Sequence, residues 1–290
     1  MIPRTFLCLV VLAVFCTIAA ASPDIVNRAN ALYQHTDYEA SLRLLAQDPS
    51  PDAADYILTG KNYFQLGDYK RATDAFEKAL ATASNISVSS DASLWLGRTW
   101  GRRAETSNSP MAVVYASRTR QFFEKAVALD PRNREAKNDL FDFYLNAPGI
   151  MGGGLDKAEA AARSIAGERP PEYQLEEAQL AEKRGDYAAA EAHMRRAMEL
   201  APAEPGRVVD LARFLAKRGR LEESDRLFEE ARKLGPNKPG VALAQAKTDI
   251  ENHRNLDQAR KLLREYLQAG LTPDDPPRKE AEKLLQRAGQ

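Results

Sequence analysis

The sequence predicts an all-α solenoid of about seven pairs of antiparallel helices, followed by one capping helix. Three observations carry this prediction. Residues 53–86 read as two amphipathic helices joined by a tight turn. Similar pairs recur along the chain, and two of them follow each other at a spacing of 34 residues. Residues 276–290 begin with two prolines and continue as a charged helix, as expected where a helix covers the end of a repeat array.

The segment 53–86 shows how one pair is built. Gly60 lies on the apolar face of the first predicted helix, and Phe76 lies on the apolar face of the second. A small residue opposite an aromatic one lets two helices approach closely. Gly67 can adopt the left-handed conformation that ends the first helix, and Asp68 can cap the second.

Further segments repeat this pattern with different fidelity. Three match it most closely, namely 53–86, 171–204 and 205–238. Two more, 91–131 and 134–168, match it with insertions, and the units at the two ends, 24–48 and 241–271, match it weakly. Weak end units are expected in a repeat array because each has solvent on one side.

This pattern resembles the tetratricopeptide repeat, whose 34-residue unit carries an aromatic residue, Leu-Gly, Tyr, Ala, Phe, Ala and Pro at fixed offsets. The resemblance covers nearly all of residues 22–290. It implies a right-handed superhelix in which the first helix of each pair lines a concave groove. Proteins of this family serve many unrelated partners, so the resemblance indicates binding without naming what is bound.

The unit 91–131 holds about ten residues more than a regular one. The small residue of its first helix and the aromatic residue of its second are 26 positions apart instead of 16. We therefore expect longer helices in this unit. The polar stretch 84–93 is predicted to be a connector, with Asp91 capping the helix that follows.

The connection at 145–156 is long and rich in glycine, which rules out a continuous helix. Its last glycines lead into a helix and could bind an anion through their backbone N–H groups: Gly152, Gly153 and Gly154. Asp156, at the expected cap position, would compete for the same donors, and a lengthened helix connection has the same composition. The loop resembles those of some exported bacterial tetratricopeptide proteins, including ones similar to the accessory component of TRAP transporters.

Residues 1–21 have the pattern of a secretory signal peptide, with a basic start, an apolar run and three alanines before Ser22. The alternative is an uncleaved membrane anchor. Both cysteines, Cys8 and Cys16, lie in this segment, so residues 22–290 contain none. We expect an exported protein, periplasmic or secreted and belonging to a bacterial envelope, without disulfide or thiol chemistry.

Composition and motifs point away from catalysis. Lys+Arg and Asp+Glu both number 41, so no net field attracts nucleic acid or an anionic membrane. The three histidines lie in different repeats, and the common nucleophile, zinc and phosphate-loop motifs are missing. Adjacent acids such as Glu176 and Glu177 are expected on solvated helix faces. The sequence therefore predicts neither an enzyme nor a metal or cofactor.

The family's groove positions can be transferred onto this sequence through the resemblance. They fall on Lys61, Phe64, Trp95, Arg98, Arg102, Asn138, Asp142, Gln179, Arg213 and Lys217. Trp95, Arg98 and Arg102 share one helix face, and an indole beside two guanidiniums suits a peptide carboxylate or an acidic segment. In the alternative interpretation, Trp95 packs into the inserted segment and the arginines pair with nearby acids.

The leading prediction is a non-enzymatic exported scaffold that binds a protein or peptide in its groove and assists assembly of an envelope complex. The alternative is an accessory component of a solute transport system, similar to those associated with TRAP transporters, that binds a small molecule. A mostly polar groove argues mildly against a hydrophobic ligand. The sequence leaves the partner's identity and the oligomeric state open.

Overall fold

The computed structural model describes residues 23–289, so the predicted signal peptide lies outside the described residues. The described part contains fifteen α-helices and no strand. The pairs are α1 (Pro23–Gln34) with α2 (Tyr38–Leu45), α3 (Ala53–Gln65) with α4 (Tyr69–Thr82), α5 (Ile86–Glu105) with α6 (Ser109–Leu129), α7 (Arg134–Asn146) with α8 (Leu155–Arg163), α9 (Pro170–Arg184) with α10 (Tyr187–Leu200), α11 (Pro205–Lys217) with α12 (Leu221–Leu234), and α13 (Pro239–Glu251) with α14 (Leu256–Gln268). A last helix, α15 (Arg278–Ala288), follows them, and a short 3-10 helix, η1 (Gly149–Met151), precedes α8.

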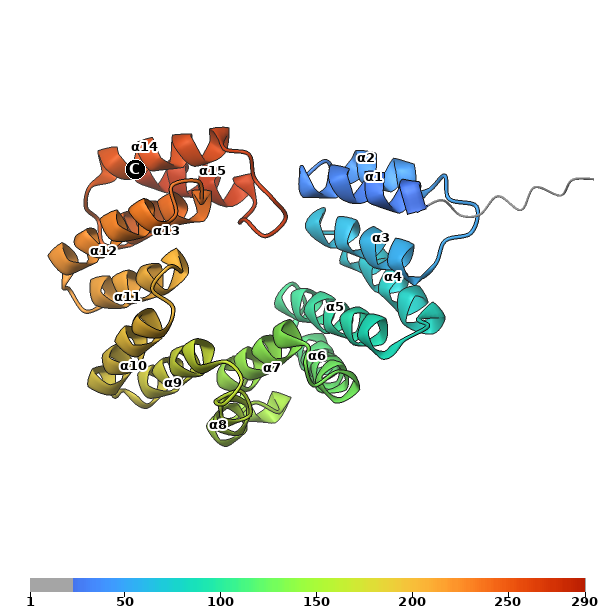
Figure 1. Cartoon of the computed structure of the whole chain (residues 1–290), viewed down its shortest axis with the longest axis horizontal. Helices are drawn as coiled ribbons and strands as arrows, with labels where there is room; N and C mark the ends of the chain where they lie inside the picture. Colours follow the sequence, from blue (N-terminus) through green and yellow to red (C-terminus); the bar gives the residue numbers. More distant parts are fainter. Residues whose placement is uncertain (1–22, 290) are drawn as a thin grey trace, which may run out of the picture.

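The pairs stack side by side into a strongly curved array (Figure 1). The first helices of the pairs, from α3 to α13, lie on the inner side of the curve, and their partners lie outside. Each pair also contacts the next one along the chain. The predicted solenoid of seven pairs and a terminal helix is thus confirmed.

Small residues sit opposite aromatic rings within the pairs, as predicted. Phe76 is fully buried, and a Cβ added at Gly60 would lie 2.5 Å from its ring. The same relation holds one unit later, where a Cβ at Gly97 would lie 2.4 Å from the ring of Phe123. Since such distances are not tolerated, only glycine allows these helix pairs to close over their aromatic residue.

The turns also follow the prediction. Gly67 has a φ of +77°, and the side chain of Asp68 accepts a hydrogen bond from the backbone nitrogen of Arg71 at 3.1 Å. Gly185 and Gly219 adopt the same left-handed conformation at the equivalent turns. A residue with a Cβ would be strained there.

The predicted connector at 84–93 is wrong. Most of it belongs to α5, which begins at Ile86 because the side chain of Asn85 accepts from the backbone nitrogen of Val88 at 2.9 Å. Asp91 therefore lies inside a helix, where it forms an ion pair with Lys61 at 3.6 Å. The extra residues of this unit lengthen both helices, to 20 residues in α5 and 21 in α6.

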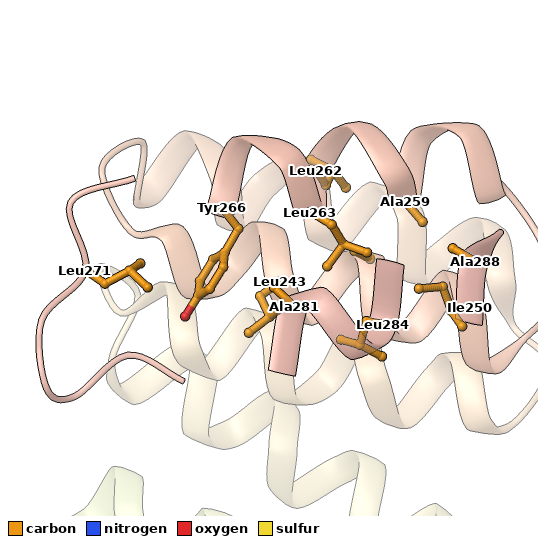
Figure 2. Packing of buried hydrophobic residues seen from close by; sticks show 11 residues of the cluster. Leu243, Ile250, Ala259, Leu262, Leu263, Tyr266, Leu271, Ala281, Leu284 and Ala288 are labelled. Carbon is orange, nitrogen blue, oxygen red and sulfur yellow. The ribbon is translucent and has the colours of Figure 1, made fainter. Parts of the chain in front are cut away.

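The C-terminal helix covers the end of the array, as expected. Ala281, Leu284 and Ala288 of α15 are buried against an apolar cluster that includes Leu263 and Tyr266 of α14 (Figure 2). The exposed side of α15 is charged, so the last unit ends in a polar surface.

The connection between α14 and α15, residues 269–277, is here termed the closing segment. It reaches back to the N-terminal units, where Gln65 Nε2 of α3 donates a hydrogen bond of 3.1 Å to the carbonyl oxygen of Pro273. Tyr266 Oη donates to the carbonyl oxygen of Pro276 and fixes the segment to α14. The two ends of the curved array are therefore joined by a direct contact.

The packing predicts a large effect for truncating a central aromatic residue. Phe228 is fully buried between α11, α12 and α13, so Phe228→Ala should lower the free energy of unfolding by about 3–5 kcal/mol. Leu234→Ala is the control, because Leu234 is 39% exposed on the same helix. Equal thermal melts for wild type and Phe228→Ala would show that the assigned register is wrong.

Candidate functional site

A pocket of about 700 Å³ lies between α3, α5, α6, α7 and the closing segment. Its lining comes mainly from the inner helices α3, α5 and α7, with Thr119 and Phe123 contributed by the outer helix α6. Five of the predicted groove residues line it, namely Phe64, Trp95, Arg98, Arg102 and Asp142. Five of the seven positions transferred onto α3, α5 and α7 thus converge on one pocket, and Lys61 and Asn138 do not line it.

Trp95 forms one wall of this pocket and is 9% exposed. Its ring stacks on Phe76 at 5.7 Å between centroids and meets Phe64 edge-on at 5.3 Å. The guanidinium of Arg98 lies 4.7 Å from its centroid, and the ammonium of Lys61 lies 5.1 Å away. The indole therefore packs on the preceding unit, and not into the inserted segment.

The two arginines of the predicted carboxylate site already have acidic partners. Arg98 Nε lies 2.6 Å from Asp139 Oδ2, and its Nη2 lies 2.9 Å from Glu135 Oε2. Arg102 Nη1 lies 2.8 Å from Glu105 Oε2. A carboxylate ligand would have to displace these acids, so the pairing favours the alternative interpretation of the arginines.

The remaining predicted groove residues are spread along the concave side. Asn138 Oδ1 accepts a hydrogen bond of 2.9 Å from Arg169. Gln179 and Lys217 line a second pocket of about 480 Å³ between α7, α9 and α11. Arg213 is exposed on α11. These residues extend the polar surface beyond the first pocket without joining it.

Two carboxyl groups on neighbouring inner helices have raised pKa values. The surrounding protein partly desolvates Asp142 and raises its pKa from an ordinary 3.8 to about 6, with a further contribution from Asp139. Burial raises the pKa of Glu176 from 4.5 to about 8, although Arg169 opposes the shift. Glu176 is only 6% exposed, and its Oε2 atom has no hydrogen-bond partner.

Glu176 therefore corrects the expectation of a solvated helix face. It lies two positions before the small residue Ala178, as Trp95 does before Gly97 and Asp210 before Ala212. This offset places a side chain between the first helices of adjacent pairs, where it is covered by neighbours. The repeat register could have revealed it, whereas the adjacent-acid pattern could not.

The glycine loop offers no free backbone donors at the three predicted positions. The N–H groups of Gly152, Gly153 and Gly154 donate to the carbonyl oxygens of Gly149, Pro148 and Tyr144. A Cβ at Gly153 would lie 1.9 Å from the carbonyl oxygen of Ala147. Asp156 does not cap α8, because the helix begins at Leu155 and Gly154 occupies the cap position. These contacts are those of a lengthened helix connection.

No helix within residues 23–289 is both long and apolar enough to cross a membrane. No group of three or more histidine, cysteine or acidic side chains in this range is arranged to hold a metal ion.

Comparisons with known proteins agree with this architecture. Residues 56–85 and 181–248 each match a model of the tetratricopeptide repeat. A tetratricopeptide repeat protein from Parabacteroides merdae aligns with 92% of this chain and 98% of its own at 13% identity and a TM-score of 0.56. A thermophilic tetratricopeptide protein from Thermus thermophilus aligns with 66% of this chain and 97% of its own at 19% identity and a TM-score of 0.53. No curated protein matches the chain.

Stacked helix pairs with one covered end define a helical-repeat solenoid. The two matched segments lie in different parts of that solenoid and carry the same register of small and aromatic residues. Residues 56–85 and 181–248 are thus identified as tetratricopeptide repeats, and the described array has the fold of such repeats. Proteins built from this repeat are in general non-catalytic scaffolds for protein–protein interaction.

The raised pKa of Glu176 predicts a pH-dependent stability. The folded chain holds this proton more tightly than the unfolded chain, so the free energy of unfolding falls as pH rises from about 4.5 to about 8. Glu176→Gln removes the titration and should stabilise the protein by about 1–2 kcal/mol at pH 8, with little effect at pH 4.5.

Urea unfolding at several pH values measures this effect. Glu229→Gln is the control, because Glu229 is exposed on the outer helix α12. A Glu176→Gln profile that runs parallel to wild type between pH 4.5 and 8 would show that Glu176 ionises normally.

Proposed function

We propose that this protein is a non-enzymatic, exported scaffold that binds an extended segment of a protein partner along its concave side. The observation that carries the proposal is the presence of two separate pockets along that side. Two pockets, of about 700 and 480 Å³, lie on the inner helices between α3 and α11. Both are lined by polar, charged and aromatic side chains, which suits an extended peptide better than an apolar ligand.

The inner surface is also rigid. Its side chains project from helices, and Trp95 is held by the rings of Phe64 and Phe76. A rigid surface loses little conformational entropy when a partner binds. Export would place this scaffold in a bacterial envelope, where it would assist assembly of a complex.

A second candidate function is small-molecule binding as an accessory to solute transport. The observation that favours it is the closing segment, which covers one side of the 700 Å³ pocket. This volume falls within the range of about 300–1,000 Å³ that is usual for small-molecule sites. The two functions differ in whether a protein is captured.

Capture from an envelope extract tests the scaffold function. Arg213→Ala/Lys217→Ala removes two positive charges from α11 on the concave side. Arg226→Ala/Lys233→Ala removes the same charge from the exposed side of α12 in the same unit and serves as the matched control. We expect the first variant to capture at least about tenfold less partner than wild type, and the control to capture the wild-type amount.

Equal capture by both variants would contradict binding along this part of the groove. If folded wild-type protein captures no partner, the scaffold proposal fails, and the small-molecule function becomes the one to screen.

A further inference from the structure

The 700 Å³ pocket carries an excess of negative charge. Two guanidiniums line it, those of Arg98 and Arg102. The carboxylates that line it number six and belong to Glu105, Asp139, Asp142, Asp274, Asp275 and Glu280. They come from three separate parts of the chain, α5, α7 and the region from the closing segment into α15.

Internal ion pairs and hydrogen bonds account for part of this set. Asp139 and Glu105 hold the two arginines. Asp275 accepts hydrogen bonds from the backbone nitrogen and hydroxyl of Thr272, and Glu280 lies 3.2 Å from Lys247 Nζ.

Asp142 and Asp274 are left without an ion pair among the described residues. Asp142 is exposed on the pocket side of α7. Asp274 lies in the closing segment, which lines the same pocket. A cation bound in this pocket would therefore have carboxylates from two parts of the chain available to it.

The aromatic wall adds a second attraction for a cation. Phe64, Trp95 and Phe143 line the same pocket as Asp142. The face of an indole or phenyl ring attracts ammonium and guanidinium groups. The ring of Trp95 already has two cations beside it, Arg98 at 4.7 Å and Lys61 at 5.1 Å from its centroid, so a further cation would meet mainly Phe64 and Phe143.

A further observation concerns a buried carboxyl group on α9 that does not line the pocket. Glu176 is 94% buried, its Oε2 atom has no hydrogen-bond partner, and it interacts electrostatically with Asp142. Arg169, the nearby cation, is bound to Asn138 at 2.9 Å and lies 3.8 Å from Glu172. Because its pKa is raised to about 8, Glu176 is mostly protonated at neutral pH, and a positive group at Asp142 would favour its ionised form.

We propose that the pocket takes a basic side chain of the partner, a lysine or an arginine, between Asp142, the aromatic wall and the closing segment. The inference rests on the proposed function, because it names the chemistry of the partner segment that the scaffold binds. It also reverses the sequence-based expectation of an acidic ligand, since both arginines of that site are already paired.

Peptide selection tests this proposal. Peptides are selected from a displayed library of random 12-residue sequences, and the binding of the selected peptides is measured by fluorescence polarisation. We expect the selected peptides to share a lysine or arginine at one position. Their binding should weaken at least about tenfold on Asp142→Asn. Glu229→Gln, which makes the same change of charge on the outer helix α12, should leave it unchanged. Circular dichroism confirms that both variants are folded.

The other possible results distinguish a failure of this inference from a failure of the proposed function. Selected peptides that lack a shared basic residue, or basic peptides that bind wild type and Asp142→Asn equally, would overturn the basic-side-chain site and leave a peptide-binding groove. No peptide selected by folded wild-type protein would overturn both.

Discussion

The fold depends on a repeated contact between a small residue and a large one inside each helix pair. Gly60 faces Phe76 and Gly97 faces Phe123 at distances that leave no room for a Cβ. Later units use Ala178 with a methionine instead. Because this contact sets how closely two helices approach, it also sets how one pair stacks on the next. The curvature and the inner surface follow from that stacking.

The chemistry of the inner surface depends on the side chains that lie between the first helices of adjacent pairs. The position two residues before the small one carries Trp95 in α5, Glu176 in α9 and Asp210 in α11. Neighbouring pairs partly cover these side chains, so acids there are desolvated and the pKa of Glu176 rises to about 8. The concave side therefore combines charge with restricted access to water, which strengthens its electrostatic interactions with a bound group.

Helix pairs, turns and the terminal cap could be predicted from sequence because each depends on residues close together in the chain. Gly67 and Asp68 form their turn by local geometry alone. Five of the transferred groove positions line one pocket, because the repeat register determines which face of its helix each residue occupies. The ion pairs of Arg98 could not be predicted, because Asp139 lies 41 residues away on another pair. The contact between the closing segment and Gln65 could not be predicted either, because it joins residues that are 208 positions apart in the sequence.

The central claim is that the partner lies on the concave side. Site-specific photo-crosslinking tests it directly, with benzoylphenylalanine placed at Gln179 on the inner helix α9 or at Glu229 on the outer helix α12. Mass spectrometry then identifies the protein crosslinked at each position in an envelope extract. The account predicts one partner crosslinked from Gln179 and not from Glu229. Crosslinks from Glu229 alone would place the partner on the convex side and contradict it.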